Sequence, residues 1–332
     1  MQALPRNGDA PRHAGMSPIY GLRPRCETIT PSREGCLEFS LRSRGEDSHP
    51  FFPPGEWMGF FMSLRRILFF LFFSATCAAQ AAAPRRVVSL MPSHTEIMGL
   101  LGAEQSLVAV GDAEDASVMP QRPRVASLPP NWEFLVAIRP DLILADVSHR
   151  RYEKDFRRFH LPAVYLPATQ ARSLEDVFEL IREIGRRLER SGQAEAFIQK
   201  SEARLKALEA RLPTGPGPRV YFEIWPRPLQ ACGPNTLQGH MLARARAVNV
   251  VPASRATMPL ISLEWVPQTG PDVILHTGVV SSEEVAGRPG WGQVPAVRNR
   301  RVHAVDRNLF SRAGPRVVYA FERLIQLLYP QP

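Results

Sequence analysis

The sequence predicts an α/β fold of two Rossmann-like lobes with parallel sheets, joined by a long rigid backbone helix, with a ligand cleft between the lobes. The first reason is a repeated phrase, since "NWEFLVAIRPDLILA" begins at Asn131 and "SLEWVPQTGPDVILH" begins at Ser262. The second is a strand-like opening at residues 86–90 that recurs at 219–223, at a similar offset. The third is the helical spacing of apolar residues across 173–212. Repeats at a nearly constant offset indicate two copies of one architecture.

Each copy of the repeat is typical of a helix, a tight turn and a buried strand, because a Pro-Asp pair interrupts the helical pattern and an apolar run follows. The N-terminal lobe is predicted over residues 82–172. Its first strand leads into a helix that Ser93 or Thr95 can cap and that ends at Gly102. Further alternation of strands and helices, with nearly continuous apolar strands, predicts a parallel sheet covered by helices.

A helical linker is predicted over residues 173–212, with a break at Ser191-Gly192. Its second helix, of about 19 residues, would be roughly 28 Å long, which is enough to reach from one lobe to the other. The linker is therefore expected to be a rod and not a flexible hinge. The C-terminal lobe is predicted over 213–332, repeats the same scheme and ends in the helical segment "GPRVVYAFERLIQLLYP".

The first 81 residues are predicted to lie outside both lobes. Residues 62–81 have the layout of a secretory signal peptide, with two arginines, a short apolar core and an Ala-Gln-Ala cleavage site. The mature protein is therefore expected in the periplasm, although Cys77 leaves lipidation as an alternative. Residues 1–61 are rich in Pro, Arg, Ser and Gly and are expected to be either a disordered leader or a segment that is not made, with the true start at Met58 or Met62.

Composition and motifs exclude several classes of function. The chain of 332 residues has a net charge of +9, but its arginines are scattered among acids and no aromatic-basic module for nucleic acid is present. Cys232 is the one cysteine after the cleavage site, so no intramolecular disulfide is expected. No phosphate-binding loop, dinucleotide fingerprint or Gly-x-Ser-x-Gly elbow occurs. The adjacent Ser93 and His94 leave an exported α/β hydrolase as a weak alternative to a binding protein.

Two α/β lobes joined by a stiff helix create a cleft, which is where open α/β sheets bind ligands. From Arg85 onward the chain resembles the helical-backbone (class III) substrate-binding proteins of ABC importers, and most closely their cobalamin-binding branch. The motifs that carry this resemblance are "RVVSLMPSHTEIMGLLGA", "PNWEFLVAIRPDLILA", "SLEWVPQTGPDVIL", "RPGWGQVPAVRNRRVHAVD" and "LFSRAGPRVVYAFERL". The resemblance implies a monomer without catalytic activity or a cofactor of its own, which delivers a cobalamin-like corrinoid to an ABC permease and ATPase complex. Haem, a ferric siderophore or a divalent metal are the alternative ligands.

The candidate ligand-binding residues follow predicted strands and therefore should line the cleft. They are Ser93, His94, Asp112, Leu128, Asp146, Trp225, Gln230, Met258, Phe310 and Arg312. Aromatic residues line much of the pocket in cobalamin binders of this family, whereas Leu128, Asp146 and the Asp112 loop stand where three of them are expected. Arg312, in "FSRAGPR", matches the family's pattern and is expected to be a polar anchor for the ligand.

A metal site is an alternative, because three histidines also fall near the ends of predicted strands. Imidazoles of His94, His149 and His276 could coordinate a divalent metal or the iron of haem if they converged from the two lobes. Their spacing is not a recognised metal signature.

The repeated phrase places one glutamate at the same point of each lobe. If Asn131 and Ser262 cap their helices, Glu133 and Glu264 lie in the first turn, where a carboxylate stabilises the helix by about 0.3–1 kcal/mol. In the family that the chain resembles, the corresponding glutamates dock on arginines of the permease. Glu133 and Glu264 are therefore expected to be docking residues, with helix-start stabilisation as the alternative.

Overall fold

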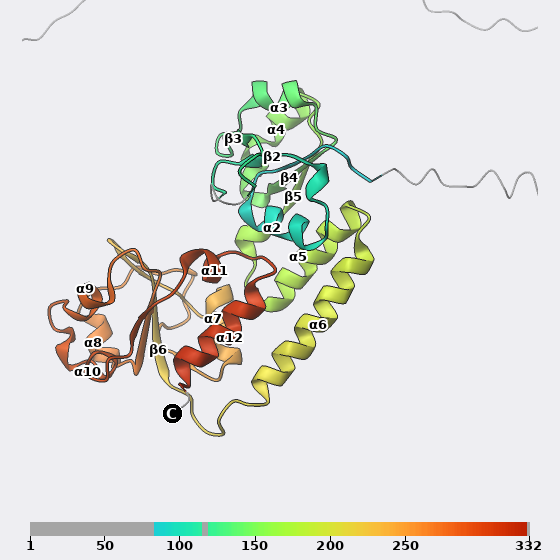
Figure 1. The fold of residues 1–332 in the computed structure, drawn as a ribbon. Helices are drawn as coiled ribbons and strands as arrows, with labels where there is room; N and C mark the ends of the chain where they lie inside the picture. Colours follow the sequence, from blue (N-terminus) through green and yellow to red (C-terminus); the bar gives the residue numbers. More distant parts are fainter. Residues whose placement is uncertain (1–82, 115–118, 331–332) are drawn as a thin grey trace, which may run out of the picture. The chain divides into compact units, whose positions relative to one another are not determined.

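The computed structural model describes residues 83–114 and 119–330 (Figure 1). The signal peptide predicted at 62–81, the leader at 1–61 and the alternative role of Cys77 lie outside the described residues. Among the residues described, no helix combines the length and the apolar composition needed to cross a membrane.

The N-terminal sheet is parallel throughout, as predicted. Its strands are β1 (Val87–Ser89), β2 (Leu107–Gly111), β3 (Arg124–Val125), β4 (Leu142–Asp146) and β5 (Ala163–Leu166), in the order β3-β2-β1-β4-β5. In the centre of the sheet Val88 is in register with Ala109 of β2 and Ile143 of β4. Strands β1 and β4 are buried on both faces, which explains why their sequences are continuously apolar.

Short helices connect these strands. They are α2 (Pro92–Leu100), η1 (Glu104–Ser106), α3 (Trp132–Ile138), η2 (Val147–Tyr152), α4 (Glu153–Arg158) and η3 (Ala168–Gln170). The predicted cap of α2 is wrong, because Met91 occupies the N-cap position and no side chain caps this helix. The predicted cap of α3 is confirmed, since the Asn131 side chain accepts a hydrogen bond of 3.0 Å from Phe134 N.

The backbone of the molecule consists of α5 (Leu174–Arg187) and α6 (Ser191–Glu209). A reciprocal capping box between Ser173 and Asp176 starts α5. The two helices are separated by residues 188–190, so Ser191 begins the second helix and does not interrupt it as predicted. The predicted length of the second helix is correct at 19 residues.

The C-terminal sheet is mixed, which corrects the prediction of a parallel sheet. Its strands are β6 (Arg219–Pro226), β7 (Leu229–Ala231), β8 (Val248–Asn249), β9 (Val273–His276) and β10 (Val302–Ala304), in the order β10-β9-β6-β7 with β8 beside β6. Strand β7 pairs antiparallel with β6, whereas the other pairs are parallel. Only Arg227 and Pro228 connect β6 to β7, and two residues can close a hairpin but not a crossover.

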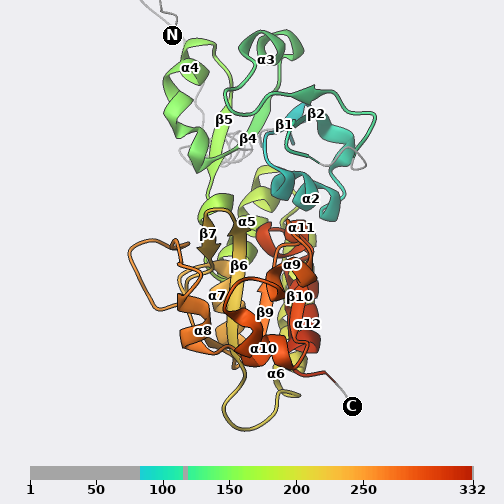
Figure 2. The same cartoon turned by 90° about the vertical axis from the view of Figure 1, so that its left-hand side faces the viewer.

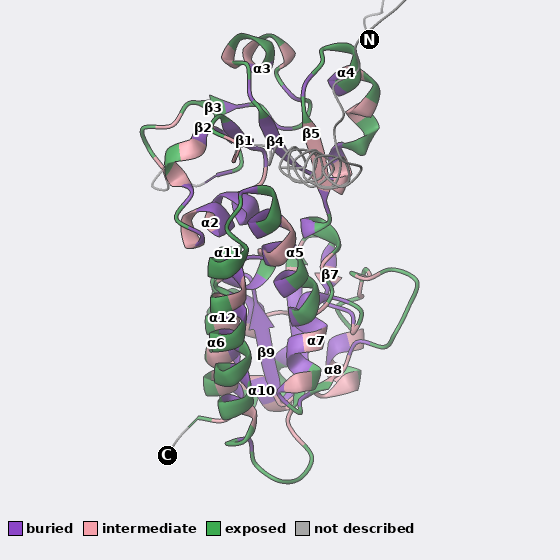
Figure 3. Cartoon of the chain, turned by 90° about the vertical axis from the view of Figure 1, so that its right-hand side faces the viewer, coloured by how far each residue is buried: buried purple, intermediate pink, exposed green. Residues whose placement is uncertain are grey.

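The helices of the C-terminal lobe are α7 (Leu237–Arg244), α8 (Trp265–Thr269), α9 (Ser282–Ala286), η4 (Trp291–Gln293), α10 (Pro295–Arg298), α11 (Arg307–Ser311) and α12 (Val317–Leu328). Helix α12 packs against α6 and α7. In Figure 3 the central strands β4 and β9 are buried, while α12 and α6 carry exposed residues on their outer faces.

One hydrophobic core continues through both lobes. It joins Val87 and Leu144 of the N-terminal sheet to Phe222 and Leu275 of the C-terminal sheet by way of the buried faces of α5, α6 and α12. Two smaller clusters cover the other face of each sheet. Separating the lobes would expose part of the shared core to water, which is unfavourable in proportion to the apolar area exposed.

Candidate functional site

Two adjoining cavities lie where the lobes meet. One, of about 270 Å³, is bounded by η3 and the segment after it on the N-terminal side and by residues 235–238 and 257–258 on the C-terminal side. The other, of about 400 Å³, is bounded by residues 91–93 and by residues 307–308 and 311–313. Ala168, Thr169, Ser311 and Ala313 line both cavities, so the two are parts of one cleft.

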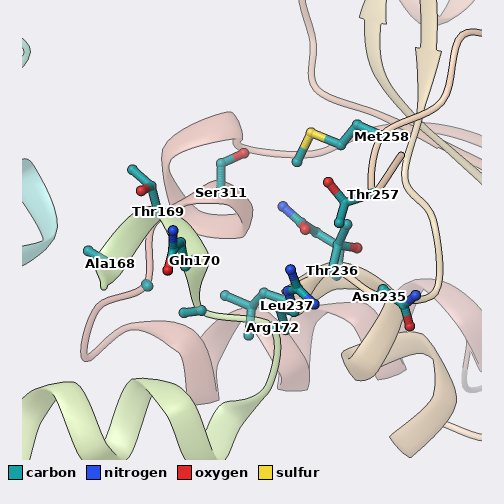
Figure 4. A pocket seen from close by; sticks show the side chains of 13 residues that line it. Ala168, Thr169, Gln170, Arg172, Asn235, Thr236, Leu237, Thr257, Met258 and Ser311 are labelled. Atoms are coloured by element: carbon teal, nitrogen blue, oxygen red, sulfur yellow. The ribbon is translucent and has the colours of Figure 1, made fainter. Parts of the chain in front are cut away.

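Figure 4 shows the first cavity from close by. Ala168, Thr169 and Gln170 lie on one side, Ser311 projects from α11, and Met258 and Thr257 come from a loop of the C-terminal lobe. Arg172, Thr236 and Leu237 line the same cavity. Hydroxyl, amide and guanidinium groups share this wall with apolar side chains, and no aromatic residue lines either cavity in the part of the chain that the structure describes.

Asp146 holds η3 in place at the edge of the cleft. Its side chain is completely buried at the end of β4, where Oδ2 accepts a hydrogen bond of 2.9 Å from Thr169 N and Oδ1 accepts one of 2.6 Å from the Thr169 hydroxyl. Ser148 N donates a third, of 2.8 Å. Burial opposes ionisation, but hydrogen bonds from Thr169 and Ser148 outweigh it and lower the pKa of Asp146. The predicted ligand contact of Asp146 is corrected to a supporting role.

Arg312 forms an ion-paired bridge between the lobes. Its Nη1 lies 2.8 Å from Oε1 of Glu96 on α2 and 3.3 Å from Oε1 of Glu114, while its side chain is 14% exposed. Arg316 binds the same Glu96 carboxylate at 2.7 Å. Arg312 lines the larger cavity as predicted, but it is not a free polar anchor, because two carboxylates already compensate its charge.

Four other predicted residues lie at or near the cleft. Ser93 lines the larger cavity and Met258 the smaller one. Gln230 donates a hydrogen bond of 3.0 Å to the Met258 carbonyl and so supports the loop that carries Met258. Trp225 is 38% exposed and lies under the guanidinium of Arg307, which lines the larger cavity, with 5.3 Å between the guanidinium carbon and the ring centroid.

Besides Asp146, Trp225 and Gln230, four more predicted residues line neither cavity. His94 and Phe310 are buried in the protein interior and line neither cavity, so their ligand contact stays a prediction. Phe310 packs edge-on against Phe222, with 5.9 Å between ring centroids. Asp112 and Leu128 are exposed but line neither cavity, and Asp112 accepts a hydrogen bond of 3.1 Å from Ser127 N.

The three histidines of the alternative metal site do not converge. His149 accepts a hydrogen bond of 3.1 Å from Asp146 N in the N-terminal lobe, whereas His276 lies on β9 of the other lobe, 2.9 Å from the Ser282 hydroxyl. Burial lowers the pKa of both histidines, and it lowers that of His94 to about 4. Within residues 83–114 and 119–330, no group of three His, Cys, Asp or Glu side chains could hold a metal ion.

Sequence reasoning missed several residues of the cleft. Thr169 and Arg172 follow β5, and Arg307 and Ser311 belong to α11, which follows β10. The rule that ligands bind beyond the carboxyl ends of strands would have selected the segment after β5, had it been applied to all strands.

The repeated phrase has a structural role that is the same in both lobes. Asp141 accepts hydrogen bonds from the backbone N–H groups of Arg85 (2.8 Å) and Arg86 (3.0 Å) at the start of β1. Asp272 likewise accepts one of 2.9 Å from Arg219 N at the start of β6. The side chains of Arg86 and Arg219 in turn bind the last carbonyls of α3 and α8. The Pro-Asp pair therefore fastens each repeated helix to the first strand of its lobe.

Both repeated glutamates are exposed and outside the cleft. Glu133 lies in the first turn of α3, as predicted. Glu264 is itself the N-cap residue of the five-residue α8, and the predicted side-chain cap by Ser262 is not formed. Figure 1 shows α3 and α8 on different lobes and both away from the backbone helix α6. Neither glutamate lines either cavity.

Comparison with protein families and curated proteins gives a consistent result. Residues 87–309 match the family described as periplasmic binding protein. The chain is 29% identical over 255 residues to "Uncharacterized ABC transporter substrate-binding lipoprotein YvrC" of Bacillus subtilis, covering 74% of this chain and 81% of that protein. It is 30% identical over 265 residues to "Vitamin B12-binding protein" of Pectobacterium carotovorum, covering 76% and 91%.

Solved structures share the fold. A possible iron-binding (periplasmic solute-binding) protein from Staphylococcus epidermidis has a TM-score of 0.67 at 25% identity and covers 74% of this chain and 99% of its own. The periplasmic haem-binding protein RhuT from Roseiflexus sp. has a TM-score of 0.65 at 26% identity, covering 74% and 98%. Sequence and fold agree along nearly the whole described chain. The protein belongs to the periplasmic binding protein family, whose members bind substrates for ABC transporters and are not enzymes.

Proposed function

We propose that this protein captures a cobalamin-like corrinoid in the cleft between its lobes and delivers it to an ABC permease and ATPase complex. The observation that carries the proposal is the 30% identity to a vitamin B12-binding protein, which extends over 91% of that relative and therefore over both walls of the cleft. Two adjoining cavities bounded by both lobes give a large, irregular ligand a place to bind.

A haem or a ferric chelate is the second candidate ligand. The likeness to a haem-binding protein at 26% identity supports it, as does the chemistry of the cavity walls. Arg172 and Arg307 line the two cavities, and no acidic residue lines either cavity in the part of the chain that the structure describes. Such walls suit a ligand with carboxylate groups.

Ligand identity can be read from the visible spectrum of the washed protein after incubation with cobalamin, cobinamide, haem or ferric siderophores. We expect cobalamin to be retained at one equivalent. Ser311→Trp should abolish retention, because Ser311 is exposed on α11 and lines both cavities. Ser191→Trp is the matched control, since Ser191 is exposed at the start of α6 outside the cleft. Retention of haem alone would replace the corrinoid with the second candidate, and equal retention by both variants would move the ligand away from this cleft.

The proposed function requires that the protein is exported and that it docks on a permease. The predicted signal peptide and the family of periplasmic binding proteins support a location outside the cytoplasmic membrane, where an ABC permease is accessible. Glu133 and Glu264 are the proposed docking residues, because both are exposed and neither is committed to the cavities. The protein is proposed to act as a monomer, so that its two lobes present one glutamate each.

A further inference from the structure

The N-terminus of α2 opens into the larger cavity without a cap. Met91 is at the N-cap position, and no side chain accepts a hydrogen bond from the first turn of this nine-residue helix. Pro92 has no backbone N–H and His94 N donates a hydrogen bond of 3.0 Å to Met91 O, so the Ser93 N–H is the first-turn donor without an intrahelical acceptor, at the helix end that carries partial positive charge. Pro92 and Ser93, the first two helical residues, line the cavity.

Ser93 is a second and independent sign of a missing ligand group. The residue is only 3% exposed, and its hydroxyl has no hydrogen-bond partner among the described residues. A buried hydroxyl without a partner costs about 1–3 kcal/mol of desolvation, so buried hydroxyls are nearly always paired in folded proteins. An acceptor atom in the adjoining cavity would supply the partner.

Arg307 adds a positive charge to the same cavity. Its guanidinium lies over the Trp225 ring, and within residues 83–114 and 119–330 it forms no ion pair with a carboxylate. The neighbouring Asp306 is occupied as the N-cap of α11, where its side chain accepts a hydrogen bond of 2.9 Å from Leu309 N. The other arginine in this cavity, Arg312, is compensated by Glu96 and Glu114.

We infer that the Ser93 N–H at the N-terminus of α2, the Ser93 hydroxyl and the Arg307 guanidinium form a subsite for an anionic oxygen group of the ligand. Helix N-termini and arginines are the usual partners of phosphate and carboxylate groups. The inference rests on the proposed function, since it assigns a role within the proposed ligand cleft. The shared chemistry is an anionic oxygen, which a corrinoid supplies as the phosphodiester of its nucleotide loop and a haem as its propionates.

Paired probes distinguish the two sources. Cobalamin is compared with cobinamide, which lacks the phosphodiester, and haem is compared with haem dimethyl ester, which lacks the free carboxylates. In the wild-type protein, the probe that carries the anion, cobalamin or haem, should bind roughly tenfold to a hundredfold more tightly than its partner, cobinamide or haem dimethyl ester. This is the difference expected for hydrogen bonds to a charged group. In Arg307→Gln this preference should disappear, because the probe with the anion loses the contact that distinguishes it from its partner probe.

Three further variants separate the subsite from general damage. Arg307→Lys keeps the charge and should retain most of the preference. Arg323→Gln removes an exposed arginine of α12 outside the cleft and should behave like the wild type. Ser93→Ala should weaken binding of cobalamin or haem several-fold without lowering the midpoint temperature of thermal unfolding, because it removes an unpaired hydroxyl. A purely structural Ser93 would instead lower the midpoint.

Inorganic phosphate tests the subsite even if neither chelate binds. Millimolar phosphate should raise the thermal midpoint of the wild type above that in sodium chloride of equal ionic strength, and should not do so for Arg307→Gln. Stabilisation by phosphate without binding of any chelate would reject the proposed ligand but keep the subsite. Equal affinities within each probe pair, or no difference between phosphate and chloride, would overturn the subsite.

Discussion

At the scale of single residues, the repeated Pro-Asp pair shows how one short phrase can serve two purposes. Asp141 and Asp272 bind the backbone at the start of β1 and β6, so the architecture of each lobe explains why the Pro-Asp pair is repeated. Among the described residues, the exposed Glu133 and Glu264 have no comparable contact, which leaves them accessible to a partner. The alternative of helix-start stabilisation applies to Glu133 more than to Glu264, since only Glu133 lies in a first helical turn.

His94 predicts a pH dependence of stability. Burial lowers its pKa from 6.5 to about 4. Between these values the unfolded chain binds a proton that the folded protein excludes, so the free energy of unfolding falls as the pH is lowered through this range. The wild type should lose roughly 2 kcal/mol of stability from this residue between pH 7 and pH 5, as measured by urea unfolding.

Two variants isolate this effect. His94→Gln should remove that part of the pH dependence, although it lowers stability at pH 7 as well. His160→Gln is the control, because His160 is exposed and should leave the pH profile unchanged. A pH profile of His94→Gln that runs parallel to that of the wild type would contradict a protonation-linked role.

At the scale of elements, an ion-pair network joins α2 to the segment between α11 and α12. Arg312 is 14% exposed and contacts Glu96 and Glu114, whereas Arg316 is 46% exposed and shares Glu96 (Figure 2 shows α11 next to α2). The two arginines bind the same carboxylate but differ in solvent exposure. This provides a matched pair for measuring how burial changes the contribution of an ion pair.

We expect Arg312→Gln to lower the free energy of unfolding by about 3 kcal/mol or more, because it removes one partner of a buried ion pair. Arg316→Gln should cost about 1 kcal/mol or less, since exposed pairs contribute little. Urea unfolding at two salt concentrations measures the loss of unfolding free energy for each variant relative to the wild type. Only the loss caused by Arg316→Gln should become smaller at high salt. Similar small losses for both variants would show that the bridge between the lobes is not a stabilising contact.

At the scale of the whole molecule, the shared core limits how far the lobes can move. Because one hydrophobic cluster runs from the N-terminal sheet through α5 and α6 to the C-terminal sheet, a wide opening would expose buried apolar surface. We therefore expect the protein to present its two lobes to a partner as a nearly rigid body. The distance between the proposed docking residues Glu133 and Glu264, one on each lobe, should then stay nearly constant.

The docking proposal is tested by charge reversal. Glu133→Lys/Glu264→Lys should bind ligand like the wild type but fail to support uptake of labelled ligand, because like charges across an interface cost several kcal/mol. Each single reversal should keep partial uptake, since the other lobe can still engage. The control Glu189→Lys/Glu202→Lys makes the same change in net charge on exposed residues at the backbone helices. Undiminished uptake by the first double variant would leave the two glutamates without a docking role.

The sequence by itself determined the fold class, the two lobes and the helical backbone, because these depend on periodic patterns and on local signals such as Asn131 and the Pro-Asp pairs. It also placed Ser93, Met258 and Arg312 at the cleft, since the ends of parallel strands share one edge. The prediction of a parallel C-terminal sheet was wrong at β7, which pairs antiparallel with β6 because only two residues connect these strands.

Only the tertiary structure decided which side chains face the cleft and which are buried or paired in the protein interior. His94, Asp146 and Phe310 follow the expected strands, yet burial and hydrogen bonds commit them to the interior. Arg312 reaches the cavity, but its charge is compensated by two carboxylates that precede it in the chain by about 200 residues. No local pattern can indicate such a partner, because burial and ion pairing depend on distances between segments that only the folded chain brings together.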